Sequence, residues 1–389
     1  MANVFMVGYA NVAMGLRGLD SFQVGIAFSG GAVTAIFFQM LSAFFMDRYQ
    51  AVSAKRTILV IAGITMGLTV LLDRSGLSAS TILLLYMLVL GAEMSLDSIV
   101  YTMAMEIMNY GWNLNFGFCR GIGSISYAVI MTVSGYFLSW IGYERLFLVF
   151  LVFQTLFLLA VLRMENPRIR KVQGQEQKEM ISVNRAYSSK GYIAFLKENK
   201  IVLAMLAGIA LMSMCGNIIE NFQIDILREL GGDERMMGIS RGLSAAIEFP
   251  VMSSFLFLRK KFSVRHILMF AMVVYCIRSG IYAFTGSVQG VLLAQGVQGV
   301  AFALYNLSST CFINESIPLE DVAKGQAVIG MATRGAGGIL ANSLGGYLIE
   351  QTSAHTALYL CLLLTLAGTV IITGAALKGQ DRIAERGML

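Results

Sequence analysis

Charged residues are what this sequence lacks most. Only 13% of its 389 residues are Asp, Glu, Lys or Arg, about half the share found in soluble globular proteins. Hydrophobic residues make up 57% of the chain, and the mean hydropathy is +0.70. Such a chain has too few charges to cover a water-facing surface and too many apolar residues to stay disordered. An ordinary soluble enzyme and a disordered protein are both excluded, which leaves a chain that crosses a membrane several times.

Proline, histidine and paired cysteine are also scarce. With three prolines and long apolar runs, the spans should be helices, because a β-barrel shows short alternating segments instead. The five cysteines are far apart and form no CxxC or Cys/His metal spacing, so we interpret them as small packing residues. No phosphate-binding GxxxxGK[ST] motif occurs, and the two histidines lie in separate predicted loops. We therefore expect no metal, no cofactor and no enzymatic activity.

Apolar runs of membrane-spanning length recur along the chain. A helix needs roughly 20 apolar residues to cross the hydrocarbon core. We predict an all-α membrane protein with twelve transmembrane helices, the first of them short for a full crossing. The predicted spans are residues 2–16, 23–46, 57–73, 81–105, 117–141, 146–163, 200–222, 236–258, 266–285, 288–311, 325–350 and 356–377.

The basic residues are concentrated in alternate loops. Twenty of the 29 Lys and Arg residues lie in one set of loops and five in the opposite set. Because loops rich in Lys and Arg stay in the cytoplasm, we predict a multi-pass protein of the cell (inner) membrane with both termini cytoplasmic. This topology accounts for the net charge of +6, so we expect a lipid bilayer and no nucleic acid as partner.

A polar segment divides the predicted spans six and six. We predict an N-terminal six-helix bundle at 1–163, a cytoplasmic linker at 164–199, a C-terminal six-helix bundle at 200–377 and a cytoplasmic tail at 378–389.

The two halves of the chain repeat each other. Because six spans is an even number, both halves have the same orientation, and a pseudo-two-fold axis along the membrane normal would relate them. This architecture is typical of transporters that bind their cargo at the midplane between the halves. The matching segments are Gly18-x-Asp20 and Gly25 with Gly231-x-Asp233 and Gly238 at a shift of 213, and Arg120-Gly-Ile-Gly-Ser with Arg334-Gly-Ala-Gly-Gly at a shift of 214.

Several motifs carry a family resemblance. They are Asp47-Arg48 with Lys55-Arg56, FGFCRGIGSISYAV (116–129), Glu248-Phe-Pro250, Arg278 and RGAGGILANSLGGYL (334–348). On these residues the chain resembles the major facilitator superfamily (MFS) over nearly its whole length, and within it the lactose-permease-like and nucleoside-proton-symporter-like branch. The resemblance implies the MFS fold, alternating access, and a cytoplasmic gate formed by Asp47, Arg48, Lys55 and Arg56.

Three polar residues share one face of the fourth predicted span. Glu93, Asp97 and Tyr101 are spaced i, i+4 and i+8. An ionisable residue at the centre of a spanning helix costs roughly 2.5–3.5 kcal/mol on insertion scales, so we interpret this face as the lining of a substrate cavity. An ion pair that only holds helices together, or packing at a wet helix end, is the alternative.

The fifth span begins with a basic residue, Arg120. In the resembled symporters, an acid on helix 4 and the matching Arg on helix 5 contact substrate hydroxyls. A guanidinium donates hydrogen bonds and a carboxylate accepts them, so together they suit vicinal hydroxyls. This resemblance implies substrate binding by Arg120 with Glu93 or Asp97. Glu106 is an alternative, local partner for Arg120.

Two opposite charges lie near the middle of the second half, Glu248 and Arg278. A nearby Arg favours an ionised Glu, and desolvation favours the protonated form. Our hypothesis for proton coupling is that this contact forms and breaks during transport. A permanent structural salt bridge is the alternative. The tenth span has no ionisable group in place of the His and Glu of the resembled permeases, so either Glu248 takes over that role or the protein is an uncoupled facilitator.

Amide and aromatic residues complete the candidate substrate site. They suit a neutral, hydroxyl-rich ligand, although an aromatic stripe is also common in packing. We predict a monomeric secondary transporter that moves a small neutral solute, a sugar or nucleoside, by proton symport. A proton-driven exporter of drugs or metabolites is the alternative, disfavoured because helix 5 lacks the Gly-Pro motif of those proteins; a non-transporting receptor or scaffold is a third class. The additional substrate-binding candidates are Tyr275, Gln295, Gln298 and Asn306.

Overall fold

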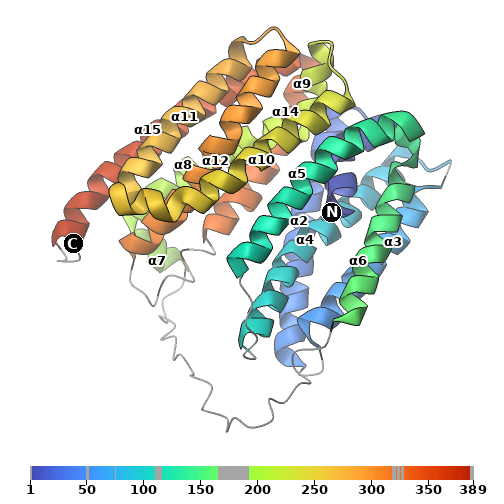
Figure 1. Ribbon diagram of the computed structural model, residues 1–389, viewed down its shortest axis with the longest axis horizontal. Helices are drawn as coiled ribbons and strands as arrows, with labels where there is room; N and C mark the ends of the chain where they lie inside the picture. The colour runs from blue at the N-terminus through green and yellow to red at the C-terminus, as the bar shows by residue number, and fades with distance from the viewer. Residues whose placement is uncertain are drawn as a thin grey trace.

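The computed structural model describes residues 2–49, 52–74, 76–109, 116–164, 192–317, 321, 325 and 328–385. For residues 47, 105, 106, 108, 109, 116–121, 192, 193 and 379–385 it describes the backbone only. Throughout these ranges the chain is helical and contains no strand, as Figure 1 shows.

The helices follow one another with short connections. In chain order they are η1 (Val4–Gly8), α1 (Ala10–Leu16), α2 (Ser21–Arg48), α3 (Ala54–Leu72), α4 (Ala79–Asn109), α5 (Phe116–Ile141), η2 (Tyr143–Arg145), α6 (Leu146–Arg163), α7 (Tyr192–Glu198), α8 (Lys200–Asn221), α9 (Gln223–Glu229), α10 (Glu234–Lys261), α11 (Val264–Phe284), α12 (Val288–Ser316), η4 (Met331–Gly337), α14 (Gly338–Gln351) and α15 (Ala354–Glu385).

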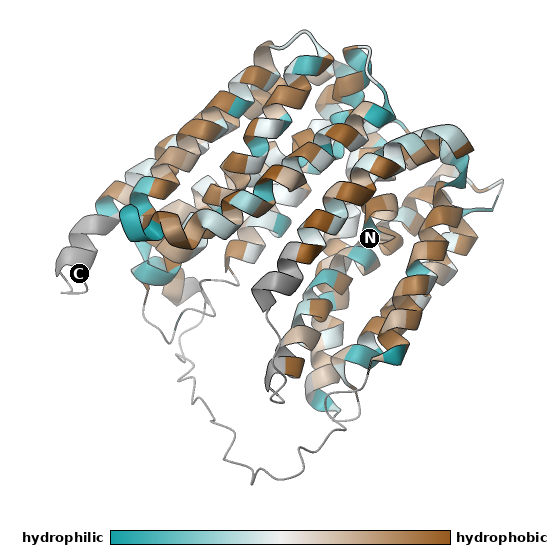
Figure 2. Ribbon diagram, in the orientation of Figure 1, coloured by the Kyte–Doolittle hydropathy of each residue, from teal (hydrophilic) through white to brown (hydrophobic). Residues whose placement is uncertain are grey.

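Ten helices in the described ranges are long and apolar enough to cross a membrane. They match ten of the twelve predicted spans, and Figure 2 shows apolar residues along them with hydrophilic residues gathered toward their ends. The other two predicted spans are divided. The span at 2–16 consists of η1 and α1, and the span at 325–350 contains the π-helical η4 followed by α14. A multi-pass all-helical protein is confirmed, and the count of twelve crossings stays a prediction.

Part of the predicted linker is structured. Its last residues form α7, and the side chain of Phe195 is buried in the core of the second half. The predicted cytoplasmic linker at 164–199 thus ends in a short helix that packs against α8, and its bounds stay a prediction. Residues 165–191 lie outside the described part of the chain.

The repeated Gly-x-Asp sequence starts the same helix in each half. Gly18 and Gly231 have φ angles of +80° and +78°, a left-handed conformation that glycine adopts without steric penalty. Two residues later, Asp20 and Asp233 each accept a hydrogen bond from a backbone N–H in the first turn, at 2.7 and 3.0 Å. The repeat thus turns the chain and then caps the N-termini of α2 and α10.

The two halves contact each other through two helix pairs, α5 with α10 and α2 with α14. A shift of about 213 residues carries α2 onto α10 and α5 onto α14, so each pair is the repeat of the other. A two-fold axis between the halves would produce this exchange. In Figure 1 the blue-to-green half and the yellow-to-red half lie side by side along these pairs.

The hydrogen bonds between the halves cluster at one end of the molecule. Ser29 Oγ lies 2.8 Å from Ser343 Oγ, and the backbone N–H of Ser21 donates to Glu350 at 3.0 Å. We call this the closed end, where α2 begins and α5 finishes. The opposite end, where α6 finishes at Arg163, is called the linker end.

Glycines allow the backbones to meet at the closed end. A Cβ atom added at Gly25 of α2 would lie 2.2 Å from the carbonyl oxygen of Asn342 in α14. At Gly238 of α10, the added Cβ would lie 2.6 Å from the carbonyl oxygen of Met131 in α5. Gly25 and Gly238 are partners in the sequence repeat, so the repeat preserves the site of contact between the halves.

We predict that Gly25→Ala opens the closed end. The clash is with a backbone atom, so it should disfavour this conformation by about 1–3 kcal/mol. The measurement is disulfide formation between cysteines introduced at Ser29 and Ser343, which should fall in the Gly25→Ala protein.

The matched control is Gly63→Ala in α3, where an added Cβ meets nothing within 4 Å and should raise helix propensity by about 1 kcal/mol. Equal crosslinking in the Gly25→Ala and Gly63→Ala proteins would contradict the prediction.

Candidate substrate and coupling site

The predicted polar face of α4 is divided between two environments. Glu93 is 3% exposed, whereas Asp97 and Tyr101 are exposed. The three residues therefore do not line one open surface together in this conformation. Asp97 and Tyr101 are the two members of the predicted set that a solvated cavity would reach.

Glu93 has a partner that the sequence analysis did not identify. Its Oε1 accepts a hydrogen bond of 2.9 Å from Nε2 of Gln154 on α6, and Gln154 is 1% exposed. A buried carboxyl group without a donor would be costly, and the amide supplies one. The signal in the sequence was Gln154 itself, the single amide side chain in the apolar run LFLVFLVFQTLFLLAVLR.

The predicted basic partner of these acids, Arg120, lies in α5, but its side chain is outside the described part of the structure. The same holds for Asp47 and for Glu106, the alternative partner of Arg120. Substrate binding by Arg120 and gating by Asp47 stay predictions.

The described members of the predicted cytoplasmic gate lie at the linker end. Nζ of Lys55 donates to the backbone oxygens of Leu162, at 3.0 Å, and Met164. Lys55 thus holds the C-terminal carbonyls of α6 within its own half, as a cation does at a helix C-terminus. Arg48 and Arg56 are exposed. In a conformation closed at the linker end, these residues would contact the other half and act as the gate. That role stays a prediction.

Arg278 on α11 is buried without a hydrogen-bond partner. Its exposure is 0%, and none of its three guanidinium nitrogens has a partner among the described residues. The guanidinium carbon lies 5.7 Å from the ring centroid of Tyr275 and 5.3 Å from that of Tyr282. Two aromatic faces therefore offer cation–π attraction, about 0.5–2 kcal/mol each, in place of an anion.

The predicted contact between Glu248 and Arg278 is not formed as a hydrogen bond in this conformation. Oε1 of Glu248 accepts a hydrogen bond of 3.2 Å from Ser244, one turn earlier on α10. Helix α12 packs against both α10 and α11. The coupling contact between the two residues and its alternative, a structural salt bridge, both stay hypotheses.

The predicted residues of α12 are buried or half-buried. Gln295 and Gln298 are 2% and 3% exposed, and Asn306 is half-buried. The ring of Tyr305 meets that of Tyr275 edge-on at 5.4 Å. The hydroxyl of Tyr305 and Oε1 of Gln298 have no hydrogen-bond partner among the described residues. With Arg278, they leave donors and an acceptor on α11 and α12 without a partner among the described residues, which is unusual in folded proteins.

A second polar group connects the halves at the closed end. Arg241 on α10 donates from Nη1 to the backbone oxygen of Gly8 at 2.7 Å and from Nε to Gln223 at 2.8 Å. Nδ2 of Asn11 donates to Asp225 at 2.6 Å. Burial raises the pKa of the Asp225 carboxyl, and the Asn11 hydrogen bond opposes that shift. Arg241 therefore belongs to the closed end, and its role was not apparent from the sequence.

We predict that Arg278→Met does not destabilise the protein. Replacing a buried, unpaired cation with an apolar residue removes a desolvation penalty and leaves no polar atom without its partner. The midpoint of thermal unfolding in detergent should stay the same or rise.

The matched control is Arg241→Met, which breaks hydrogen bonds between the halves and should lower the midpoint. An equal fall in both variants would show that Arg278 is a structural residue.

Comparisons with known proteins agree with this architecture. The family model described as "MFS_1 like family" matches residues 5–360. The comparison with curated proteins found no match.

Solved structures share the fold at low sequence identity. The crystal structure of the nucleoside transporter NupG has a TM-score of 0.74 and 17% identity, covering 96% of this chain and 94% of that one. The D-xylose-proton symporter has a TM-score of 0.70 and 12% identity, covering 95% and 93%. A bacterial homolog of the human lysosomal transporter Spinster, inward-facing and occupied, has a TM-score of 0.65 and 14% identity, covering 99% and 94%. By the family match and this helical architecture, the chain belongs to the MFS_1-like family of membrane transporters, and it is not an enzyme.

Proposed function

We propose that this transporter imports a small neutral polar solute, a sugar or a nucleoside, by proton symport. The observation that carries the proposal is the set of buried polar groups on α11 and α12 that have no hydrogen-bond partner among the described residues. Hydroxyl groups both donate and accept hydrogen bonds, so a hydroxyl-rich cargo would satisfy the guanidinium of Arg278, the amide oxygen of Gln298 and the hydroxyl of Tyr305.

The charges within the described spans favour a neutral cargo. Acids stand at Glu93 and Asp97 on α4 and at Glu248 on α10, while Arg278 is the buried base of the second half. A site with acids on both sides would repel an anion, and the unpaired Arg278 would repel a cation. The structures of a nucleoside transporter and of a xylose-proton symporter, which share this fold, are in keeping with such a cargo.

The exposed polar residues indicate which end is open. Asp97 and Tyr101 on α4 and Arg334 in η4 are exposed, although their helices belong to the membrane-spanning core of the two halves. A carboxylate facing lipid at mid-membrane would cost roughly 2.5–3.5 kcal/mol, so water in a central cavity is the better explanation. Because the hydrogen bonds between the halves lie at the closed end, this cavity would open at the linker end. In this proposal that end is cytoplasmic, because the loops rich in Lys and Arg lie there.

Helix α10 would connect proton binding to movement of the halves. It carries Gly238 and Arg241, which contact the first half, and Glu248 seven residues beyond Arg241. Seven residues rise about 10.5 Å along a helix, so the three groups belong to one rigid element. In this proposal, protonation of Glu248 removes its charge, and release of the proton allows attraction to Arg278. Either change would shift α10 against α5.

We predict that Glu248→Gln abolishes accumulation of the solute against its gradient but retains counterflow exchange. The amide keeps the shape and the hydrogen bond from Ser244 but cannot release a proton. The assay uses proteoliposomes with an imposed proton gradient and a panel of sugars and nucleosides, and the exchange reaction is measured without the gradient.

Glu144→Gln, an exposed acid in η2, is the matched control and should accumulate solute normally. Accumulation by the Glu248→Gln protein at the control level would overturn the coupling role. Failure of the wild-type protein to exchange any member of the panel would overturn the proposed cargo class.

A further inference from the structure

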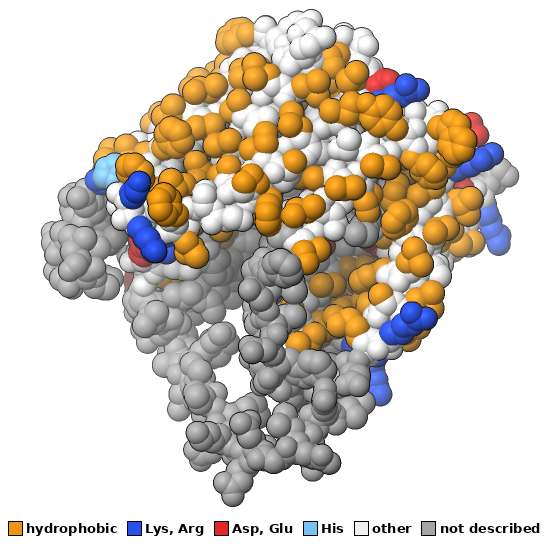
Figure 3. Space-filling view, in the orientation of Figure 1, with side chains coloured by type: hydrophobic (Ala, Val, Ile, Leu, Met, Phe, Trp, Pro, Cys, Tyr) orange, Lys and Arg blue, Asp and Glu red, His pale blue; other side chains and the backbone are white. Residues whose placement is uncertain are grey.

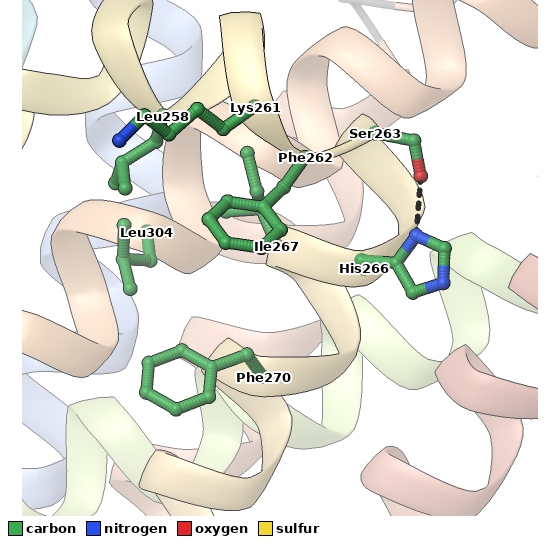
Figure 4. A pocket seen from close by; sticks show the side chains of 8 residues that line it. All are labelled: Leu258, Lys261, Phe262, Ser263, His266, Ile267, Phe270 and Leu304. Atoms are coloured by element: carbon green, nitrogen blue, oxygen red, sulfur yellow. Dashed lines mark hydrogen bonds between the residues drawn. The ribbon is translucent and has the colours of Figure 1, made fainter.

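An apolar groove lies on the second half at the linker end, away from the contacts between the halves. It has a volume of about 710 Å³, within the roughly 300–1,000 Å³ typical of small-molecule sites. Figure 4 shows the rings of Phe262 and Phe270 and the side chains of Leu258 and Leu304 turned toward this space. Ile267 and Leu304 are buried at 5% and 4% exposure and form its floor, whereas Phe262 and Phe270 are 54% and 58% exposed.

Basic side chains border this groove. The last turn of α10 contains Arg259, Lys260 and Lys261, and the first turn of α11 contains Arg265. Arg259 is already paired with Glu315 at 2.8 Å. Lys260 and Lys261 form no ion pair with any described carboxylate, and Nζ of Lys261 lies 5.0 Å above the ring of Phe257. Figure 3 shows basic side chains and a histidine gathered over the end of α10 and the start of α11, beside an apolar face.

Polar donors face the groove from its other edge. Oγ of Ser263 lies 2.7 Å from Nδ1 of His266, and the two stand opposite Lys261 in Figure 4. Ser263 makes no side-chain cap for the 21-residue helix α11, so the N-cap side chain does not accept from the backbone N–H groups of the first turn. Helix N-termini favour anions. The groove therefore combines a long apolar floor with a positively charged rim.

We propose that this groove binds an anionic phospholipid of the bilayer. Its acyl chain would lie over Ile267 and Leu304 between the two phenylalanine rings, and its phosphate would meet Lys261 at the rim. The assignment rests on two matches: the apolar floor suits an acyl chain, and the basic rim suits an anionic headgroup. A free phosphate would leave the apolar floor unused, and a lipid without net charge would leave the positive charge of the two lysines uncompensated. Basic pockets between membrane helices at the cytoplasmic side are known to bind acidic headgroups.

The test is native mass spectrometry of the full-length protein in detergent, titrated with dioleoyl phosphatidylglycerol or dioleoyl phosphatidylcholine. The first phosphatidylglycerol should bind more tightly than phosphatidylcholine. Lys261→Gln should weaken phosphatidylglycerol binding about fivefold, the effect of one lysine at a membrane surface. The control Lys378→Gln removes the same charge from an exposed site on α15 and should leave the binding unchanged.

A second pair of variants tests the apolar floor. Phe270→Ser should weaken the binding of both lipids, whereas Phe284→Ser, at the opposite end of α11 and 76% exposed, should not. Equal affinity of the wild-type protein for the two lipids would overturn the proposal. Equal losses in the Lys261→Gln and Lys378→Gln proteins would also overturn it, because they would indicate general electrostatic attraction.

Discussion

Direct backbone contact between the two halves at one end is the constraint on which this conformation depends. The contact occurs at Gly25 and Gly238, where an added Cβ would overlap a carbonyl oxygen of the other half. Because the two glycines are repeat partners, a two-fold arrangement makes both contacts at once. In the proposed transport cycle, cargo would enter or leave at the opposite end while these backbones touch, as alternating access requires.

Buried polar side chains of this protein differ in whether they have a hydrogen-bond partner. The bilayer offers no water that could take the partner's place. Glu93 is satisfied by Gln154 within the first half. Arg278 and Tyr305 in the second half have no hydrogen-bond partner among the described residues. A satisfied buried pair stabilises a bundle, whereas unsatisfied groups gain partners only when something binds. In the first half the hydroxyl of Tyr86 on α4 also has no partner among the described residues, so unsatisfied groups occur in both halves, and ligand recognition by α11 and α12 stays a proposal.

The sequence predicted features that recur along the chain, such as the spans and the repeat. It did not predict contacts between particular pairs of residues. Ten spans and the repeat follow from hydropathy and spacing, since these are local properties of the chain, and the family was inferred from the resemblance of its motifs. The Glu93–Gln154 pair joins residues 61 positions apart, and no periodicity indicates it. Lys55 was assigned to a gate by resemblance, yet here it caps α6. The divided helices at η1 and η4 were missed because π-helical turns do not alter the apolar pattern.

The most direct test of the account is a pair of distances measured by double electron–electron resonance. One spin-label pair replaces Phe22 and Tyr347, whose rings lie 6.1 Å apart at the closed end. The other replaces the exposed Phe44 on α2 and Met331 in η4, toward the linker end. The account predicts that a transported sugar or nucleoside adds a population with a longer closed-end distance and a shorter linker-end distance. Distances that stay unchanged, or that change in the same direction, would contradict it.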